Sequence, residues 1–476
     1  MSEGSLSKRG VTRRGFLTVA VSAIVAGVVA GVGAYYAGLG AAGPAATVTM
    51  PGSATTVTRT TTVTAPPVTT TVTTTRTETV TITAAPPPSE RKEIVIGCSL
   101  PLTGPNAGLG TSFVRPAYTL WAERINRRGG LLGRPVRLLI YDDASDPAKN
   151  TANVEKLITV DKVDLLLGSA GSELAIAQLA VAEKYGYTTT QTHIMPDRST
   201  WDRLKGFKYG FPIANMAAGQ TFEEYLKNLL GPWFDYLNEQ TDAKTIAIVN
   251  GKYSSTGLHA KELAAEYGLR LVYEESYELS LADFVPMMTK VKAANPDVFM
   301  SMGLIADAPE QVKAARLVGF NPKAWYIFIG ANYPGYLQGL GEAANYTFTL
   351  CIWAPTEPWL SQPGVREYIE EAKQYLGRDW LAFQDPMSYT VAHIMGEAVQ
   401  EAGTIDQEAI RKVFSTHIFN TYFGPIEFQQ PPYQLAVPKL TKGKIPVAQI
   451  QGNRPVPVWP PDLAMAKPVY PKPPWP

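Results

Sequence analysis

The chain of 476 residues contains only two cysteines, Cys98 and Cys351, and only four histidines. Two thiols cannot form a disulfide framework or a four-thiolate zinc site, and four scattered histidines leave little for a metal cluster. An excess of charge of one sign is also lacking, because 43 Lys and Arg stand against 42 Asp and Glu. These absences argue against a metal centre and against a dedicated nucleic-acid-binding protein. The length predicts about two to four domains.

Residues 1–45 contain a basic segment followed by a long uncharged stretch. Arg13 and Arg14 precede Phe16 and a long apolar run, a pattern that resembles a twin-arginine export signal. The 19 residues 19–37 are mostly apolar or small, enough to cross a bilayer core of about 30 Å. The segment is therefore either cleaved as a signal or, as we favour, kept as a membrane anchor. The positive-inside rule places the rest of the chain outside the cytoplasm.

Residues 46–92 have the composition of a stalk. Between Thr55 and Thr83, 17 of 29 residues are threonine, and three consecutive prolines follow at 86–88. Such a segment cannot bury enough apolar area to offset its ordering entropy, and β-branching and proline keep it extended. The alternative is a β-rich edge segment. The density of hydroxyl groups indicates possible O-glycosylation.

From residue 93 onwards, short β-rich runs alternate with helical periodicity. Two successive runs of strand-helix alternation predict an α/β fold with two parallel-sheet lobes, because parallel strands need a crossover that is normally helical. Ligands of such folds bind at the carboxyl ends of strands or between lobes. The predicted strands are 94–100, 136–141, 163–168, 245–250, 271–277, 298–302 and 325–329, and the predicted helices are 111–128, 147–160, 173–185, 257–267, 284–294 and 309–318.

A glycine-rich loop at 103–110 follows the first of these strands and admits two interpretations. It is similar to the cofactor-binding loop of short-chain dehydrogenases, but no Tyr-x-x-x-Lys pair occurs in the chain and Pro105 is awkward for that loop. It also resembles the opening of type I solute-binding proteins of ABC importers for branched-chain amino acids and amides. The second resemblance continues, in order and spacing, through the motifs at 125–136, 141–147, 163–172, 314–320 and 422–428.

This resemblance covers about residues 93–455 and implies a type I periplasmic binding protein fold. In that family two Rossmann-like lobes are joined by three crossing strands, which we expect near Phe211, Ile352 and Pro425. Stalks like this one resemble those of archaeal surface-anchored members. The cysteine pair that members commonly carry is replaced here by Ser145 and Gly171, so we expect Cys98 and Cys351 to be buried hydrophobic residues. The expected division is lobe 1 at 93–212 and 353–424, lobe 2 at 213–352 and 425–455, and a Pro-rich tail at 456–476.

The resemblance also implies candidate ligand-binding residues in the first lobe. Ser172 stands where the family places a serine that binds a carboxylate at a helix N-terminus, although a plain helix cap is the alternative. His193 matches by spacing a loop that contacts the ligand, and a solvated loop histidine is nearly as plausible. Leu109 replaces an aromatic residue near the pocket mouth, which leaves that wall aliphatic.

In the second lobe, the candidates are Tyr253, Ser254 and Asn332. Tyr253 and Ser254 lie in a strand-to-helix loop where the family uses an aromatic residue to close over the ligand. Asn332 stands where amino-acid-specific members often carry an acid for the α-ammonium group. An amide supplies no charge, so an ordinary α-amino acid is a doubtful ligand.

The predicted function is extracytoplasmic capture of a small amphiphilic ligand for an ABC permease, by a monomer without cofactor, metal or enzymatic activity. The ligand classes left open are a branched-chain or hydrophobic amino acid, an amide, a urea-like compound and a carboxylic acid. The alternatives are an exported NAD(P)-dependent oxidoreductase and a ligand-sensing ectodomain that acts through a partner.

Overall fold

The computed structural model describes residues 59–62, 73–76, 93–194, 198–213, 221–251, 256–278, 283–303, 305–431, 434–440 and 445–476. The chain divides into two units, Met1–Pro86 and Pro87–Pro476. In the first unit, β1 (Arg59–Thr62) pairs antiparallel with β2 (Thr73–Arg76) inside the predicted stalk. The predicted signal and anchor lie outside the described residues. No helix within the described ranges is long and apolar enough to cross a membrane.

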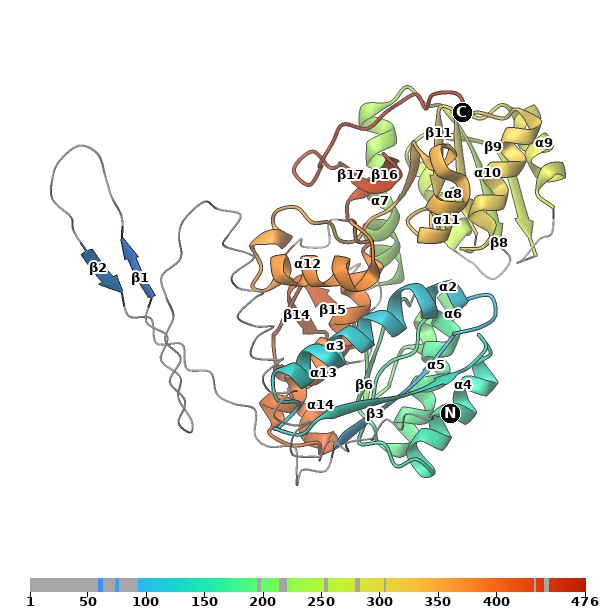
Figure 1. The fold of residues 1–476 in the computed structure, drawn as a ribbon. Helices are drawn as coiled ribbons and strands as arrows, with labels where there is room; N and C mark the ends of the chain where they lie inside the picture. The colour runs from blue at the N-terminus through green and yellow to red at the C-terminus, as the bar shows by residue number, and fades with distance from the viewer. Residues whose placement is uncertain are drawn as a thin grey trace, which may run out of the picture. The chain divides into compact units, whose positions relative to one another are not determined.

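In the second unit, residues 93–213 form the first lobe, in which parallel strands alternate with helices (Figure 1). Strand order is β4-β3-β5, and an isolated parallel bridge between Ala170 and Thr192 continues this order to the parallel pair β6-β7. The predicted parallel α/β architecture is therefore confirmed. The elements are β3 (Ile94–Leu100), α2 (Ala107–Leu109), a π-helical turn (Gly110–Val114), α3 (Arg115–Arg127), β4 (Val136–Asp142), α4 (Pro147–Thr159), β5 (Leu165–Leu166), α5 (Ser172–Tyr185), β6 (Thr189–Gln191), α6 (Arg198–Arg203) and β7 (Gly210–Pro212).

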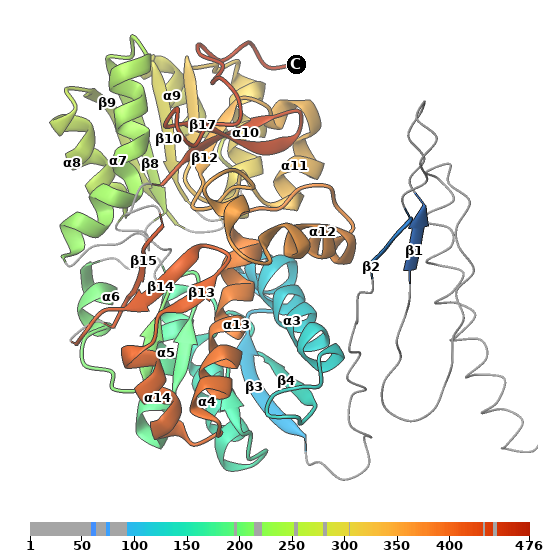
Figure 2. The ribbon, with the colours of Figure 1, turned by 90° about the vertical axis from the view of Figure 1, so that its left-hand side faces the viewer.

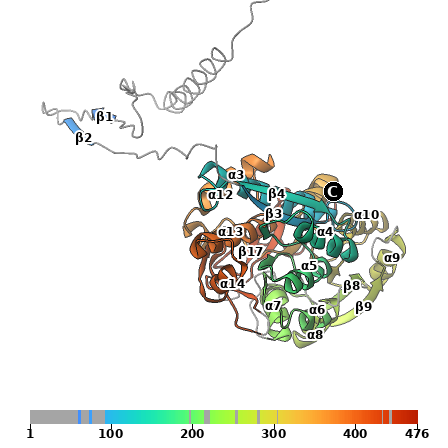
Figure 3. The ribbon, with the colours of Figure 1, turned by 90° about the horizontal axis from the view of Figure 1, so that it is seen from below.

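Local chemistry explains where these helices begin and what they cover. Asp146 caps α4 by accepting a hydrogen bond from the Lys149 backbone N–H, and Pro147 occupies the first helical position, where no N–H is needed. Seen from below, α4 and α5 lie side by side (Figure 3). Their apolar faces form a small core with β5, whereas α3 packs with the later helix α13.

The second lobe is built on a seven-stranded sheet in the order β17-β16-β12-β11-β10-β8-β9. Strands β8 to β12 are mutually parallel, and β16 and β17 add an antiparallel hairpin beside β12. Its elements before the chain returns to the first lobe are α7 (Phe222–Gln240), β8 (Thr245–Gly251), α8 (Thr256–Glu266), β9 (Arg270–Tyr277), α9 (Val285–Ala294), β10 (Val298–Met302), α10 (Asp307–Val318), β11 (Ala324–Ile327), α11 (Pro334–Leu340), a 3₁₀ turn (Gly341–Ala344) and β12 (Thr347–Leu350).

The chain then returns to the first lobe before it reaches the second again. Strand β14 pairs with β13 and β15, beside α14 (Figure 2), and only β16 joins the second lobe's sheet. The last crossing thus lies between β15 and β16, later than the expected position near Pro425, because β14 and β15 complete a sheet with β13. The elements are a 3₁₀ turn (Trp359–Ser361), α12 (Val365–Leu376), α13 (Gln384–Ala402), α14 (Gln407–Thr416), β13 (Phe419–Thr421), β14 (Gly424–Phe428), β15 (Ala436–Pro438), β16 (Val447–Gln451) and β17 (Arg454–Trp459).

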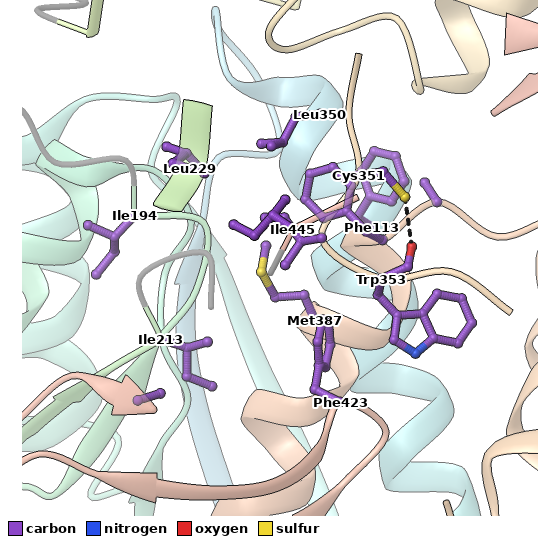
Figure 4. Close-up of a cluster of buried hydrophobic side chains, with 14 of the residues drawn as sticks. Phe113, Ile194, Ile213, Leu229, Leu350, Cys351, Trp353, Met387, Phe423 and Ile445 are labelled. Carbon is purple, nitrogen blue, oxygen red and sulfur yellow. Dashed lines mark hydrogen bonds between the residues drawn. The ribbon is translucent and has the colours of Figure 1, made fainter. Parts of the chain in front are cut away.

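One continuous hydrophobic core extends from the first lobe into the second. Where the chain passes between lobes, apolar side chains from both lobes and from the crossings gather in one cluster (Figure 4). Cys351 belongs to this cluster and Cys98 lies in β3, and both are buried free thiols, as predicted. The labelled members of the cluster are Phe113, Ile194, Ile213, Leu229, Leu350, Cys351, Trp353, Met387, Phe423 and Ile445.

Candidate functional site

The candidate site lies where the carboxyl ends of the two parallel sheets approach each other. A Cβ placed on Gly108, in α2 after β3, would lie 3.8 Å from the Ile305 side chain and 3.8 Å from the Tyr333 ring. Ile305 follows β10 and Tyr333 follows β11. The rings of Phe113 and Tyr333 also meet edge to face, with centroids 4.7 Å apart. Residues that follow strands of both lobes therefore meet, at the edge where α/β folds bind ligands.

In the first lobe, the structure brings Ser172 close to the end of β6. Ser172 is the first residue of α5, and Gly171 before it has φ of +100°, which favours glycine. The bridge between Ala170 and Thr192 sets the two strand ends side by side. They fit tightly, since a Cβ on Gly168 would lie 2.1 Å from the Thr190 carbonyl oxygen. Backbone N–H groups at the start of α5 thus lie next to the residues that follow β6.

His193 lies two residues after the end of β6 and is 8% exposed. Its Nε2 lies 2.9 Å from Ser388 Oγ on α13, and the backbone adopts a left-handed conformation with φ of +53°. Burial lowers the pKa of His193 to about 3, so the imidazole is neutral at physiological pH. The side chain is therefore buried and held by α13. The alternative expectation, a solvated loop histidine, is wrong.

Thr192 is a candidate that the sequence interpretation did not single out. Its side chain is fully buried, and its hydroxyl has no hydrogen-bond partner among the described residues. Leaving a buried hydroxyl unpaired is costly, so such a group invites a partner from outside the protein chain. Asn250 lies near the end of β8 in the second lobe. Its buried amide oxygen also has no hydrogen-bond partner among the described residues.

Asn332 lies in the second lobe but bonds to the first. Its Nδ2 donates to Gln384 Oε1 at 3.0 Å, and Gln384 Nε2 donates back to Asn332 Oδ1 at 3.3 Å. Both side chains are 2% exposed. Gln384 begins α13, so this reciprocal amide pair joins the loop after β11 to the helix that also holds His193.

The remaining sequence candidates stand apart from these contacts. Leu109 is buried in the hydrophobic core at 7% exposure, and its neighbour Gly108 is the residue that approaches the second lobe. Tyr253 and Ser254 lie outside the described residues.

Sequence reasoning missed the contribution of α13. Its polar residues Gln384 and Ser388 reach Asn332 and His193, respectively. The only local signal was the presence of polar side chains at positions that prove fully buried in an otherwise largely apolar helix. Chemically, the described site offers hydroxyls, amides and a neutral imidazole. Within the described ranges, no group of three or more His, Cys, Asp or Glu side chains is placed to hold a metal ion.

Two parallel-sheet lobes that meet at their strand ends define a two-lobed binding protein of α/β architecture. Residues 93–444 match the family model described as periplasmic binding protein. This match covers most of the chain, and the protein belongs to that family, which implies an extracytoplasmic location.

Individual relatives are distant in sequence. The Leu/Ile/Val-binding protein homolog 7 of Brucella melitensis is 25% identical over 332 residues, which cover 68% of this chain and 81% of that protein. The leucine-, isoleucine-, valine-, threonine- and alanine-binding protein of Pseudomonas aeruginosa is 23% identical over 349 residues, covering 71% of this chain and 86% of that one.

Solved structures confirm the type I periplasmic binding protein fold. The branched-chain amino acid transporter substrate-binding protein LivJ of Streptococcus pneumoniae, in complex with isoleucine, matches with a TM-score of 0.65 at 19% identity, over 76% of this chain and 98% of that one. A solute-binding protein of an ABC transporter from Rhodopseudomonas palustris, in complex with 3,4-dihydroxybenzoic acid, matches with a TM-score of 0.62 at 19% identity, over 75% and 93%.

Proposed function

We propose that this protein is the extracytoplasmic substrate-binding component of an ABC importer and captures a small amphiphilic ligand between its lobes. The observation that carries the proposal is the bridge between Ala170 and Thr192, which sets Thr192, and His193 next to it, beside the segment that leads to Ser172 at the start of α5. Family membership and the names of the relatives support the same function.

In the proposed mechanism the first lobe binds a carboxylate or amide oxygen of the ligand. The backbone N–H groups at the start of α5 and the helix dipole favour a negative or partly negative atom there. The hydroxyls of Ser172 and Thr192 add donors, and the neutral ring of His193 contributes no charge. The second lobe, with Tyr253, Ser254 and Asn332, then closes over the ligand. Closure is a population shift driven by the ligand's higher affinity for the closed form.

The ligand class we propose is a branched-chain or hydrophobic amino acid, an amide, a urea-like compound or a carboxylic acid. The relatives' names support the amino acids, and the bound 3,4-dihydroxybenzoic acid in a structure of the same fold supports an acid without an amino group. Asn332 is uncharged and pairs with Gln384, which favours ligands that lack an ammonium group.

We further propose that the closed form docks as a monomer on the transmembrane subunits of an ABC permease. The N-terminal segment at 1–45 would export the chain and hold it at the cell surface, and the Thr-rich segment at 46–92 would act as its stalk. The distribution of charge and apolar residues in the first 92 residues supports this arrangement.

A thermal-shift screen of the unit 87–476 against amino acids, their amides, urea, aliphatic and aromatic acids and nicotinamide cofactors tests the function. A ligand present at ~100 times its dissociation constant should stabilise the protein by ~2.7 kcal/mol. Ser172→Ala should then weaken binding roughly tenfold to a hundredfold, because a hydrogen bond to a charged group contributes about 1.5–3 kcal/mol. The measurement is the dissociation constant by isothermal titration calorimetry.

The matched control is Ser415→Ala, which removes a half-buried hydroxyl from α14 that bonds to the Arg411 carbonyl. It should leave ligand affinity unchanged. Stabilisation by a nicotinamide cofactor alone would overturn the proposal in favour of the oxidoreductase alternative. Equal effects of the two serine variants would refute the site at α5.

A further inference from the structure

The last 17 residues of the chain, 460–476, follow β17 and continue over the second lobe (Figure 1). We call this segment the C-terminal strap. It is rich in proline, and it lies beyond the residues that the periplasmic binding protein family model matches.

The first part of the strap bonds to the edge of the second lobe's sheet. The Met465 N–H donates to the Pro457 carbonyl of β17 at 2.8 Å. Gln449 of β16 is fully buried, and its Nε2 donates to the Val469 carbonyl while its Oε1 accepts from the Val469 N–H, both at 2.9 Å. Gln451 Nε2 donates to the Lys467 carbonyl at 2.9 Å. Two glutamine side chains thus give the strap the paired donor and acceptor that a neighbouring strand would provide.

The second part of the strap reaches loops at the amino ends of the strands. This end of the sheet is opposite the one at which the candidate site lies. The Lys472 N–H donates to the Lys323 carbonyl at 2.7 Å, just before β11 begins. Trp475 Nε1 donates to the Phe320 carbonyl at 2.7 Å in the same loop. Tyr470 OH donates to Asp242 at 2.6 Å, in the loop before β8. The strap therefore joins two loops and the β16-β17 hairpin, which are far apart in sequence.

Side-chain packing completes the attachment. The Trp475 ring packs edge to face on Trp325 of β11, with centroids 5.5 Å apart, beside the second lobe's own core. Lys472 Nζ lies 3.4 Å from the Trp475 ring centroid and donates to Asn321 Oδ1 at 2.5 Å. An amine placed over an indole face and a tryptophan N–H with its own acceptor are specific arrangements, not random coverage of a surface.

We propose that the C-terminal strap is a clamp that holds the β16-β17 hairpin and the loops before β8 and β11 together as one rigid end of the second lobe. The chain last passes from the first lobe to the second between β15 and β16. Fixing β16 therefore also fixes the point at which the chain re-enters the second lobe. A tail without a structural role would not need hydrogen bonds to the second lobe at both of its ends.

Native-state hydrogen exchange, followed by mass spectrometry of the whole protein, tests the clamp. Trp475→Ala should accelerate exchange roughly tenfold or more in peptides covering 316–327, 242–251 and 445–459, because these segments would open locally without the strap. Peptides of the first lobe, 94–191, should exchange at the rate of the unchanged protein. Gln449→Ala should accelerate exchange chiefly at 445–459.

Met465→Ala is the matched control within the strap, since its side chain is 52% exposed and only its backbone bonds to β17. It should leave exchange unchanged throughout. Unaltered exchange in the Trp475 variant would overturn the clamp, and so would an equal acceleration in both lobes, which would indicate global destabilisation. These measurements need no ligand, so their result is independent of the proposed transport function.

Discussion

Replacing Arg124 with methionine should destabilise the folded unit more than any comparable change at a neighbouring arginine. Arg124 lies on α3 with its side chain only 5% exposed. Its Nη1 donates to Tyr422 OH at 2.9 Å and to Tyr389 OH at 3.3 Å. Its Nε bonds to Glu371 of α12 at 2.7 Å. One guanidinium thus joins α3, α12, α13 and the turn after β13.

The expected loss follows from these partners. Removing one member of a buried, charge-assisted set costs about 3–5 kcal/mol, because the remaining polar groups stay buried without a partner. Glu371 is 24% exposed and can recover some hydration, and Glu367, a further partner at 2.9 Å, is 62% exposed and contributes little. Methionine retains much of the apolar contact of the arginine stem. We therefore expect a loss of about 3 kcal/mol.

Equilibrium unfolding in urea measures this loss as a change in the extrapolated free energy of unfolding. Arg127→Met is the matched control, since Arg127 lies on the same helix and pairs with the same Glu371 but is 57% exposed. It should cost less than about 1 kcal/mol. The reasoning is refuted if the two variants lose the same free energy, or if Arg124→Met loses less than about 1 kcal/mol.

Two further predictions concern the ends of the second lobe. Burial lowers the pKa of Lys472 to about 7 in the folded protein. The unfolded chain then binds more protons than the folded protein between about pH 7 and pH 10.5. The free energy of unfolding should therefore rise with pH across this window, by at most about 1.4 kcal/mol per pH unit. Lys472→Met should remove this rise when urea unfolding is measured from pH 7 to 10. Identical slopes in both proteins would contradict the shift. For the reciprocal amide pair of Asn332 and Gln384, a double-mutant cycle with alanine should give a coupling of about 1 kcal/mol in urea unfolding, and strictly additive losses would show that the pair contributes nothing.

The alternation of strands and helices could be predicted because it depends on local periodicity. The predicted strand at 94–100 coincides with β3, and the helix predicted at 284–294 differs from α9 by one residue. Burial of both cysteines was also predicted, because Cys98 lies in a predicted strand, Cys351 lies at an expected crossing, and the family's cysteine pair is absent. In contrast, the strand predicted at 163–168 forms ladder pairs only at Leu165–Leu166. Its remaining residues lead into the tight approach of Gly168 to β6, which depends on a partner that is distant in sequence.

Long-range partners explain most of what the sequence analysis missed at the candidate site. Ser172 and His193 could be singled out because the resemblance to the solute-binding family assigned roles to their positions after predicted strands. Nothing near His193 indicates that Ser388, 195 positions away, would hold its ring. Likewise, Gln384 and Asn332 are separated by 52 positions and have no shared local pattern. The crossing expected near Pro425 was misplaced for the same reason, since the pairing of β14 with β15 depends on a partner beyond it.

The path of the chain between the lobes has a consequence for biosynthesis. The first lobe needs α13, which packs against α3 and β6, and the second lobe needs β16, which pairs with β12. Neither lobe can therefore complete its core while residues beyond 384 are still being added at the ribosome. Domain-by-domain folding during synthesis, common in larger proteins, is closed to this chain. Both lobes complete their cores late in synthesis, an order of events that would suit the export route for folded proteins that we propose for the N-terminal segment.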